Sequence, residues 1–168
     1  MTTTFLYFAY GSNMSAPRLR TRTPSAEPIG TAELRGFRLV FDKWGRDGSA
    51  KADCERTDAP DQVVHGGLFR IHAVDRPAMD RAEGLGQGYD ACEVALKTER
   101  GAVTAWTYVA TDKRPGLLPY SWYLQHVLIG AKAWRLPHRY IASIASLPTV
   151  ADPDTARHAM ELSIYAPR

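Results

Sequence analysis

The order of hydrophobic and polar positions divides the chain into a strand-rich first part and a helix-rich last part. Runs rich in β-branched and aromatic residues, bounded by Gly, Pro, Asn and Asp, predict strands. These runs lie at residues 5–10, 34–41, 49–54, 62–71, 89–97 and 102–110. Apolar residues at helical spacing, behind capping residues or prolines, predict helices at residues 15–20, 75–82, 120–132, 137–146 and 154–164. This segregation indicates an α+β fold, and six or so short strands can close into a small barrel.

Glycines modify this pattern at three places. Gly66 and Gly67 are adjacent inside a predicted strand, which indicates a bulge or a close approach of another backbone. Gly101 ends the short link "TERG" between two strand-like runs, as in a hairpin. Glycines and charged residues between positions 42 and 61 predict mostly loop, with one short strand inside it.

Length and composition predict one globular domain. The 168 residues fit a single domain spanning 1–168, in which 147–168 form a C-terminal helical tail with Asp152 as cap and Pro153 at the first helical position. No apolar run approaches the roughly 20 residues of a membrane-spanning helix, and the first residues do not form a secretory signal pattern. The two cysteines, Cys54 and Cys92, are expected to be reduced and the chain to be cytoplasmic.

Charge and motif content argue against several classes of function. The formal net charge of +3 is too small to indicate nucleic-acid binding by itself. Arg18, Arg20 and Arg22 form a short basic cluster, which we interpret as a solvated helix face rather than a phosphate site. The five histidines do not pair with one another or with cysteine at metal-ligand spacing, and neither a phosphate-binding glycine loop nor a G-x-S-x-G motif occurs.

The stretch "FLYFAYGSNM" ends a hydrophobic strand abruptly in three small residues. Gly11, Ser12 and Asn13 directly follow Tyr10, and a helix is predicted after them. Small residues at a strand end leave backbone N–H groups able to face a ligand, and a helix N-terminus adds partial positive charge. The segment is therefore either a cradle for a carboxylate or oxyanion, or an ordinary turn, and these residues alone leave both open.

Glu83 is the acidic residue of "MDRAEGLGQGYD", at the predicted C-terminal end of a helix. The helix dipole slightly disfavours a carboxylate there, so a catalytic acid and a solvated last-turn residue are both open. The glycines after Glu83 suit a chain that folds tightly over a ligand, and they suit a plain helix cap equally well.

Taken together, these stretches resemble the γ-glutamylcyclotransferase family. The resemblance runs through "FLYFAYGSNM", "GFRLVFDKWG", "MDRAEGLGQGYDACEV" and "LPYSWYLQHVLIGAKAWRLPHRYI", and it covers about residues 5–146. It implies a small mixed β-barrel with flanking helices and a pocket at one end. It also implies that a γ-glutamyl amide is cleaved by cyclising the γ-glutamyl group to 5-oxoproline, with release of the amine.

The resemblance also implies site roles for seven residues. Glu83 takes the acid/base role, and a side chain at Gly11 would stand where the substrate approaches. The substrate-binding residues are Tyr10, Gly11, Ser12, Asn13, Tyr89 and Tyr120. The nucleophile is the substrate's own α-amine, so no serine or cysteine nucleophile, metal or cofactor is expected. The expected partner is a small-molecule γ-glutamyl substrate, not nucleic acid or a membrane, and a homodimer is left open.

Two alternatives to this function stay open. The substrate could be a γ-glutamylamine or a biosynthetic intermediate, with leaving-group specificity carried by loops at residues 42–61 and 111–118. The glutathione-specific branch of the family ranks lower, because it carries leucine where Asn13 stands. A non-catalytic binding module is the other alternative, although a binder of a carboxylate-bearing ligand gains nothing from an acid such as Glu83.

Overall fold

The computed structural model describes residues 2–167, and at its centre is a closed barrel of five strands. The strand order is β1-β5-β2-β6-β7, and the barrel closes where β1 pairs with β7 in parallel at Tyr7 and Trp106. All other barrel pairs are antiparallel. The barrel strands are β1 (Thr4–Ala9), β2 (Glu27–Arg35), β5 (Val63–His72), β6 (Tyr89–Thr98) and β7 (Gly101–Ala110). The predicted α+β fold with a small mixed barrel is confirmed.

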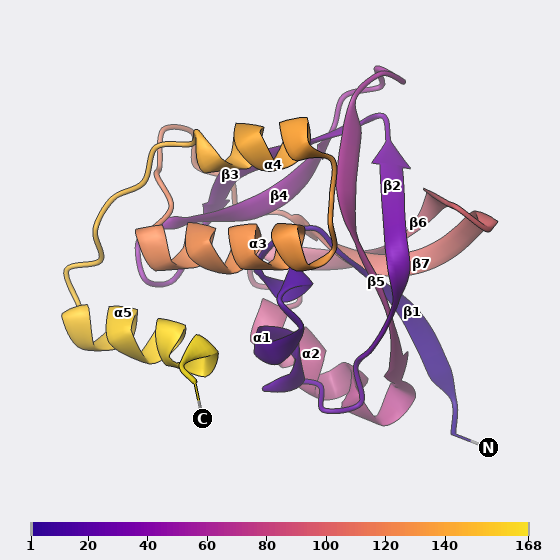
Figure 1. Cartoon of the computed structure of the whole chain (residues 1–168), viewed down its shortest axis with the longest axis horizontal. Helices are drawn as coiled ribbons and strands as arrows, with labels where there is room; N and C mark the ends of the chain where they lie inside the picture. Colours follow the sequence, from indigo (N-terminus) through magenta and orange to yellow (C-terminus); the bar gives the residue numbers. More distant parts are fainter. Residues whose placement is uncertain (1, 168) are drawn as a thin grey trace.

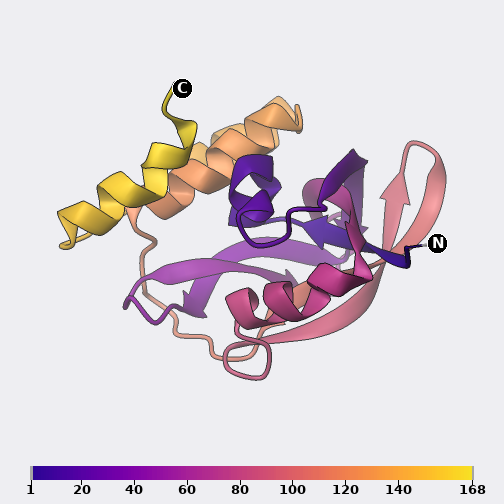
Figure 2. The same ribbon diagram turned by 90° about the horizontal axis from the view of Figure 1, so that it is seen from below.

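A separate two-stranded sheet and the helices surround this barrel (Figure 1). The sheet consists of β3 (Phe37–Trp44) and β4 (Ala50–Arg56). The helices are α1 (Ala16–Arg20), α2 (Arg76–Glu83), α3 (Ser121–Ala133), α4 (His138–Ala145) and α5 (Thr155–Leu162), with short 3-10 turns η1 (Ser12–Met14), η2 (Ala73–Asp75) and η3 (Ser163–Tyr165). Helices α3 and α4 stack on one side of the barrel, and Figure 2 shows α5 beside α3. None of the helices in the described part of the chain is long and apolar enough to span a bilayer.

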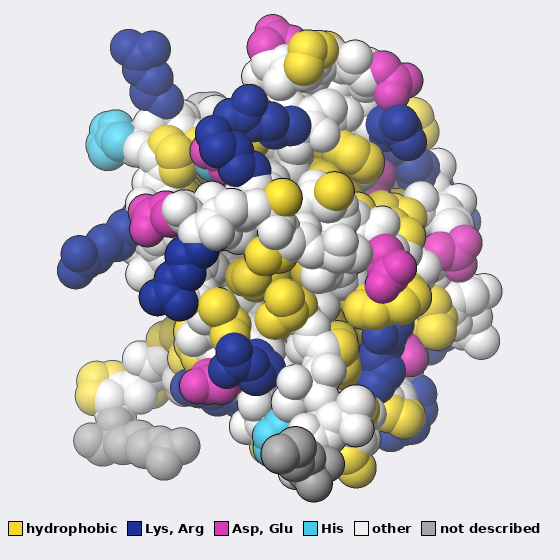
Figure 3. All heavy atoms as spheres, turned by 90° about the vertical axis from the view of Figure 1, so that its right-hand side faces the viewer, with side chains coloured by type: hydrophobic (Ala, Val, Ile, Leu, Met, Phe, Trp, Pro, Cys, Tyr) yellow, Lys and Arg dark blue, Asp and Glu magenta, His cyan; other side chains and the backbone are white. Residues whose placement is uncertain are grey.

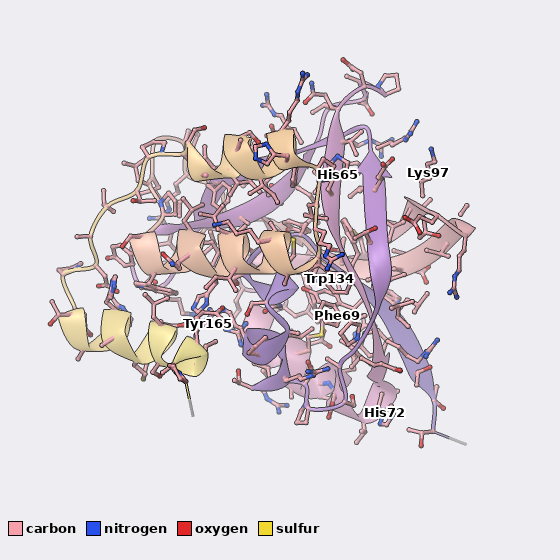
Figure 4. All side chains as sticks on the ribbon, in the orientation of Figure 1. His65, Phe69, His72, Lys97, Trp134 and Tyr165 are labelled. Atoms are coloured by element: carbon pink, nitrogen blue, oxygen red, sulfur yellow. The ribbon has the colours of Figure 1, made fainter. Side chains whose placement is uncertain are left out.

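The core fills the barrel and continues under α3. Phe8 of β1, Phe69 of β5 and Val127 of α3 are completely buried. Trp134, at the end of α3, packs edge-on against Phe69 with ring centroids 5.1 Å apart (Figure 4). Burial of each large apolar side chain contributes ~1.5–3 kcal/mol, so the α3–barrel contact holds the elements that carry the site.

The adjacent glycines of β5 allow a close approach on both faces of that strand. A Cβ at Gly66 would lie 2.3 Å from the carbonyl oxygen of Ala9 in β1, and a Cβ at Gly67 would lie 2.2 Å from the indole ring of Trp134. The expectation of a close approach is therefore confirmed. The other alternative, a bulge in β5, is not found, because β5 runs from Val63 to His72 and pairs with β1 without a register shift.

The strand predicted at residues 34–41 is divided by a turn: residues 34 and 35 end β2, and residues 37–41 begin β3. Gly36 adopts φ +78, donates to the carbonyl of Gln62 and accepts from the N–H of Thr57, so the chain reverses there. Between residues 42 and 61, the short strand predicted at 49–54 is confirmed as β4, and the predicted loop is shorter than expected because β3 extends to Trp44.

The C-terminal tail carries the predicted helix, but its cap differs from the prediction. Asp154 caps α5, because its side chain accepts from the N–H of Arg157 at 2.9 Å. Asp152 instead accepts from the indole Nε1 of Trp122 at 2.7 Å and from Arg157, which ties the tail to α3. Both cysteines are free.

Candidate active site

Two adjoining cavities lie where barrel strands, the β3–β4 sheet and helices α1, α2 and α3 meet. The outer cleft has a volume of about 320 Å³ and the inner cavity about 30 Å³. Four residues line both: Ser12 of η1, Glu83 of α2, Tyr89 of β6 and Tyr123 of α3. The inner cavity has room for only a few small groups, so a larger ligand must extend past these four residues into the outer cleft.

The loop predicted to hold the substrate forms a wall of the inner cavity. Its 3-10 turn is closed by the N–H of Met14 donating to Gly11 at 3.1 Å and the N–H of Ser15 donating to Ser12 at 3.2 Å. Within the described residues, the backbone N–H groups of Gly11, Ser12 and Asn13 have no acceptor. Three donors are therefore available at this wall, as an anion cradle requires.

Glu83 is the last residue of α2, and its environment is not that of a solvated side chain. The helix ends because Gly84 adopts a left-handed conformation, φ 70, in which its N–H donates to Arg81. The Glu83 side chain is 15% exposed. Its Oε1 accepts from Nδ2 of Asn13 at 2.6 Å and lies 3.6 Å from Nη1 of Arg22. The carboxylate is thus held against the loop that carries the free N–H groups.

Phenolic side chains dominate the inner cavity. Its tyrosines are Tyr7, Tyr10, Tyr89, Tyr108 and Tyr123. Burial raises the pKa of Tyr7 and of Tyr89 well above the ordinary value, and the negative charge of Glu83 raises each pKa further. These hydroxyls therefore stay protonated at neutral pH, and they can donate hydrogen bonds but cannot act as bases.

Hydrogen bonds fix these tyrosines to the barrel and to β4. Tyr10 donates to the carbonyl of Tyr108 at 2.5 Å, and Tyr89 donates to the carbonyl of Ala52 at 2.6 Å. Tyr123 accepts from the N–H of Ala52 at 3.0 Å. The wall of the inner cavity is consequently rigid and polar.

The outer cleft is rich in cations. Its charged lining consists of Arg18, Arg22, Lys43, Arg46, Lys51 and Arg81, with Asp47 and Glu83 as carboxylates. Lys51 pairs with Asp47 at 2.7 Å, and Arg18 pairs with Glu161 of the tail. The interpretation of the arginine cluster as a solvated helix face is therefore wrong for Arg18 and Arg22, which turn into the cleft.

Six of the seven predicted site residues line these cavities, and Tyr120 does not. Tyr120 is the residue before α3, and its hydroxyl donates to the carbonyl of Asp47 at 3.0 Å. That bond holds the turn between β3 and β4 beside the cleft and turns the phenol away from both cavities. Tyr123, one helical turn later, occupies the place expected for Tyr120.

A side chain at Gly11 would meet protein atoms, and its obstruction of the substrate stays a prediction. A Cβ there would first meet the Cβ of Ala52 at 3.0 Å and the hydroxyl of Tyr123 at 3.5 Å. The backbone of Gly11 has φ −108, so no left-handed conformation is required. Glycine at this position allows β4 to pack against the loop.

Several lining residues were missed because their signals are weak in the sequence. Arg18 and Arg22 are four residues apart, a spacing that places them on one side of a helical turn. Tyr7 and Tyr108 lie on adjacent barrel strands with ring centroids 6.0 Å apart, a neighbourhood that only the parallel β1–β7 closure creates. Lys43 lies on β3, in a segment where sequence patterns predicted loop.

A family model, curated proteins and a solved structure all match this chain. The AIG2-like family model matches residues 63–144. Proteins named gamma-glutamylcyclotransferase from Mus musculus and Homo sapiens are 31% and 30% identical to this chain, over 82% and 81% of it and 75% and 74% of their own lengths. A solved structure named gamma-glutamyl cyclotransferase has a TM-score of 0.81 and 27% identity, and the match covers 88% of this chain and 90% of that one.

The matches to the two curated relatives and to the solved structure extend over most of both chains. The solved structure has the same overall fold as this chain. The chain therefore belongs to the gamma-glutamylcyclotransferase family.

Proposed function

We propose that this protein cleaves a γ-glutamyl amide by intramolecular attack of the substrate's α-amine, releasing 5-oxoproline and a free amine or amino acid. One observation carries the proposal. Among the described residues, Glu83 is the only carboxylate that lines the inner cavity, and it also lines the outer cleft. The names of the relatives at 30% and 31% identity support the same activity.

In this proposal the substrate spans the two cavities across Glu83. The γ-glutamyl end enters toward the inner cavity, where the N–H groups of Gly11, Ser12 and Asn13 bind a negative oxygen of the substrate. The leaving amine then lies in the outer cleft. The tyrosine wall stays protonated and supplies no competing base, and Tyr7, whose hydroxyl accepts from Asn13, keeps its own proton free to donate.

Glu83 performs both proton transfers in turn. It first accepts a proton from the α-ammonium, so that the nitrogen lone pair can attack the γ-carbonyl carbon. It then donates that proton to the departing nitrogen as the original amide C–N bond breaks, and the second proton lost by the ring nitrogen passes to the released amine, which leaves as an ammonium. No water is consumed, and the new C–N bond closes the five-membered ring. General acid–base catalysis of this kind typically contributes ~10²–10⁴-fold.

The remaining rate enhancement comes from holding the chain bent and from stabilising charge. Because nucleophile and electrophile belong to one molecule, a site that fixes the cyclic geometry can contribute ~7–11 kcal/mol in favourable cases. N–H donors aimed at a developing oxyanion contribute ~2.7–4 kcal/mol each when preorganised. The rigid hydrogen-bonded wall around Ala52 and Tyr89 supports such preorganisation.

The test is product identification with γ-glutamyl-alanine as substrate. The expected products are 5-oxoproline and alanine in equal amounts, with no free glutamate. Release of glutamate would identify a hydrolase instead, and absence of any cleavage would contradict the proposal.

Replacement of the proposed acid/base tests the role of Glu83. The nearly isosteric Glu83→Gln variant should fold normally, and its turnover should fall by ~10²–10⁴-fold because the amide cannot accept the proton. Glu93→Gln is the matched control, since Glu93 is exposed on β6 and lines neither cavity. Thermal melting and 5-oxoproline formation are measured on the same samples, and near-parent turnover of folded Glu83→Gln would rule out this mechanism.

A further inference from the structure

The outer cleft has more positive charge than its own carboxylates neutralise. Three of its cations form no ion pair within the described residues: Lys43, Arg46 and Arg81. By contrast, on the face shown in Figure 3, Asp and Glu side chains lie among the Lys and Arg side chains. The face in Figure 3 therefore carries mixed charges, unlike the cleft, in which cations predominate.

Lys43 is the most informative of these cations because it is buried. It is 8% exposed, and its ammonium forms no hydrogen bond with any described residue. The ammonium lies 4.7 Å from the ring centroid of Tyr89, above the residue that separates the two cavities. Burial lowers the pKa of Lys43, although the charges of Glu83 and Asp112 oppose the shift. The ammonium itself is reached by solvent in the cleft, so a ligand that covers it without supplying a counter-ion would leave a desolvated, unpaired charge, which is costly.

Gly88 makes the position of Lys43 possible. A Cβ at Gly88 would lie 2.9 Å from Cε and 3.0 Å from Nζ of Lys43, and Gly88 adopts φ +136. The absence of a side chain at Gly88 therefore lets the side chain of Lys43 lie directly over the glycine-rich turn after Glu83. Arg46 and Arg81 are exposed at the rim, and Arg46 contacts only the uncharged amide of Gln87.

We infer that the cleft selects γ-glutamyl substrates whose leaving group is an acidic amino acid, with two carboxylates on the departing amine. This inference rests on the proposed function, which places the leaving group in the outer cleft. The leaving amino acid's own carboxylate neutralises one cation, and its side-chain carboxylate neutralises a second. A γ-glutamylamine has neither carboxylate, and its binding would leave Lys43 buried and unpaired.

The experiment compares γ-glutamyl-glutamate with γ-glutamyl-glutamine, which has the same shape without the second charge. Hydrogen bonds to charged groups are strong enough that kcat/KM for γ-glutamyl-glutamate should be ~10- to 100-fold higher. Added potassium chloride should lower the ratio of the two kcat/KM values, because salt screens the attraction between the cleft cations and the second carboxylate. Formation of 5-oxoproline is the readout, and γ-glutamyl-alanine serves as the reference substrate.

Variants of the cleft cations then test whether the cleft causes the preference for γ-glutamyl-glutamate over γ-glutamyl-glutamine. Lys43→Gln should reduce the ratio to about one-tenth of the parent value or less. Because Lys43 is buried, the double variant Arg46→Gln/Arg81→Gln, which changes only exposed side chains, tests the same point without disturbing the core. Arg35→Gln is the matched control, since Arg35 is exposed on β2 and lines neither cavity, and its ratio should equal that of the parent.

The outcomes separate the inference from the function on which it rests. Equal kcat/KM for the glutamate and glutamine leaving groups, with γ-glutamyl-alanine still cleaved, overturns the inference and leaves the proposed function intact. A ratio of kcat/KM values that stays at the parent value in both Lys43→Gln and the double variant also overturns the inference. Failure to form 5-oxoproline from any of the three substrates overturns the proposed function itself.

Discussion

At the residue scale, Asn13 connects the loop, the carboxylate and the barrel. Its Nδ2 donates to Glu83 at 2.6 Å and to the hydroxyl of Tyr7 at 3.1 Å, and its Oδ1 accepts from Arg22 at 3.0 Å. One side-chain amide therefore holds the proposed acid/base at a fixed distance from the loop N–H groups. We regard it as a positioning residue for Glu83.

Asn13→Ala should lower kcat/KM by about 10- to 100-fold, because a hydrogen bond to a charged group contributes ~1.5–3 kcal/mol. The loss should fall on kcat rather than on KM, because the bond positions the acid/base and not the substrate. Tyr7→Phe removes the other partner of Nδ2 but keeps the bond to Glu83, so its effect should be smaller. An Asn13→Ala variant with the parent's kcat would show that the amide does not position Glu83.

The part of the site that could be predicted from sequence is the part that lies within short segments. Gly11, Ser12 and Asn13 are consecutive, and Glu83 lies in one helix-to-turn motif. Tyr108 and Lys43 come from distant strands, and only barrel closure and sheet pairing place them together. Local sequence patterns do not show which distant strands pair, so most residues that line the two cavities could not be predicted.

At the scale of elements, β5 illustrates how two small residues set the packing of a strand. Gly66 faces the carbonyl of Ala9, a backbone atom of the neighbouring strand β1, which cannot move without disturbing the sheet. Gly67 faces the side chain of Trp134 at the end of α3, a half-buried indole that can shift only by losing its hydrogen bond from Nε1 to the carbonyl of Met14 (Figure 4). The two glycines should therefore differ in their tolerance of a methyl group.

Gly67→Ala should lower the free energy of unfolding by ~1–3 kcal/mol, the usual cost of overpacking, and Gly66→Ala should lower it further. Gly30→Ala on β2 is the matched control, because a Cβ there meets nothing within 4 Å, and its effect should be near zero. Chemical denaturation measures all three. In a Trp134→Leu background the cost of Gly67→Ala should shrink, and an unchanged cost would show that the indole is not the obstacle.

The prediction of elements was accurate where hydrophobic periodicity and turn residues agree. The hairpin of β6 and β7 and the helix α3 were found within one or two residues of their observed ends. The β2–β3 turn was missed because the apolar and charged residues on both sides of Gly36 alternate in a pattern that is typical of one strand. Its left-handed backbone is stabilised by hydrogen bonds to Gln62 and Thr57, which are distant in sequence.

At the scale of the whole molecule, the C-terminal tail links α3 to the cleft through a buried polar network. Glu161 pairs with Arg18, which lines the cleft, and lies 3.0 Å from Nε2 of His126 in α3. The hydroxyl of Tyr165 lies 2.6 Å from Nδ1 of His126 and 2.7 Å from Oγ of Ser15. Neutral His126, donating from Nε2 to Glu161 and accepting at Nδ1 from Tyr165, satisfies these contacts together.

This network should make folding stability depend on pH in a defined window. Burial and the charge of Arg18 lower the pKa of His126, although the hydrogen bond to Glu161 opposes the shift. When the pH falls below about 6.5, the unfolded chain therefore binds a proton that the folded chain excludes. The free energy of unfolding should decrease from about pH 6.5 toward the lowered pKa, by at most ~1.4 kcal/mol per pH unit for this residue.

His126→Gln removes this titration, so its stability should fall less steeply than that of the parent between pH 7 and 5. Denaturant titrations at several pH values measure the two slopes. Burial also lowers the pKa of His65, but His65 is present in both proteins, so the difference in slope belongs to His126. His138→Gln is the control, because His138 is exposed at the start of α4, and its curve should run parallel to the parent's. Parallel curves for His126→Gln and the parent would mean that His126 takes up its proton equally in the folded and unfolded chain, and that the tail is not docked on a neutral imidazole.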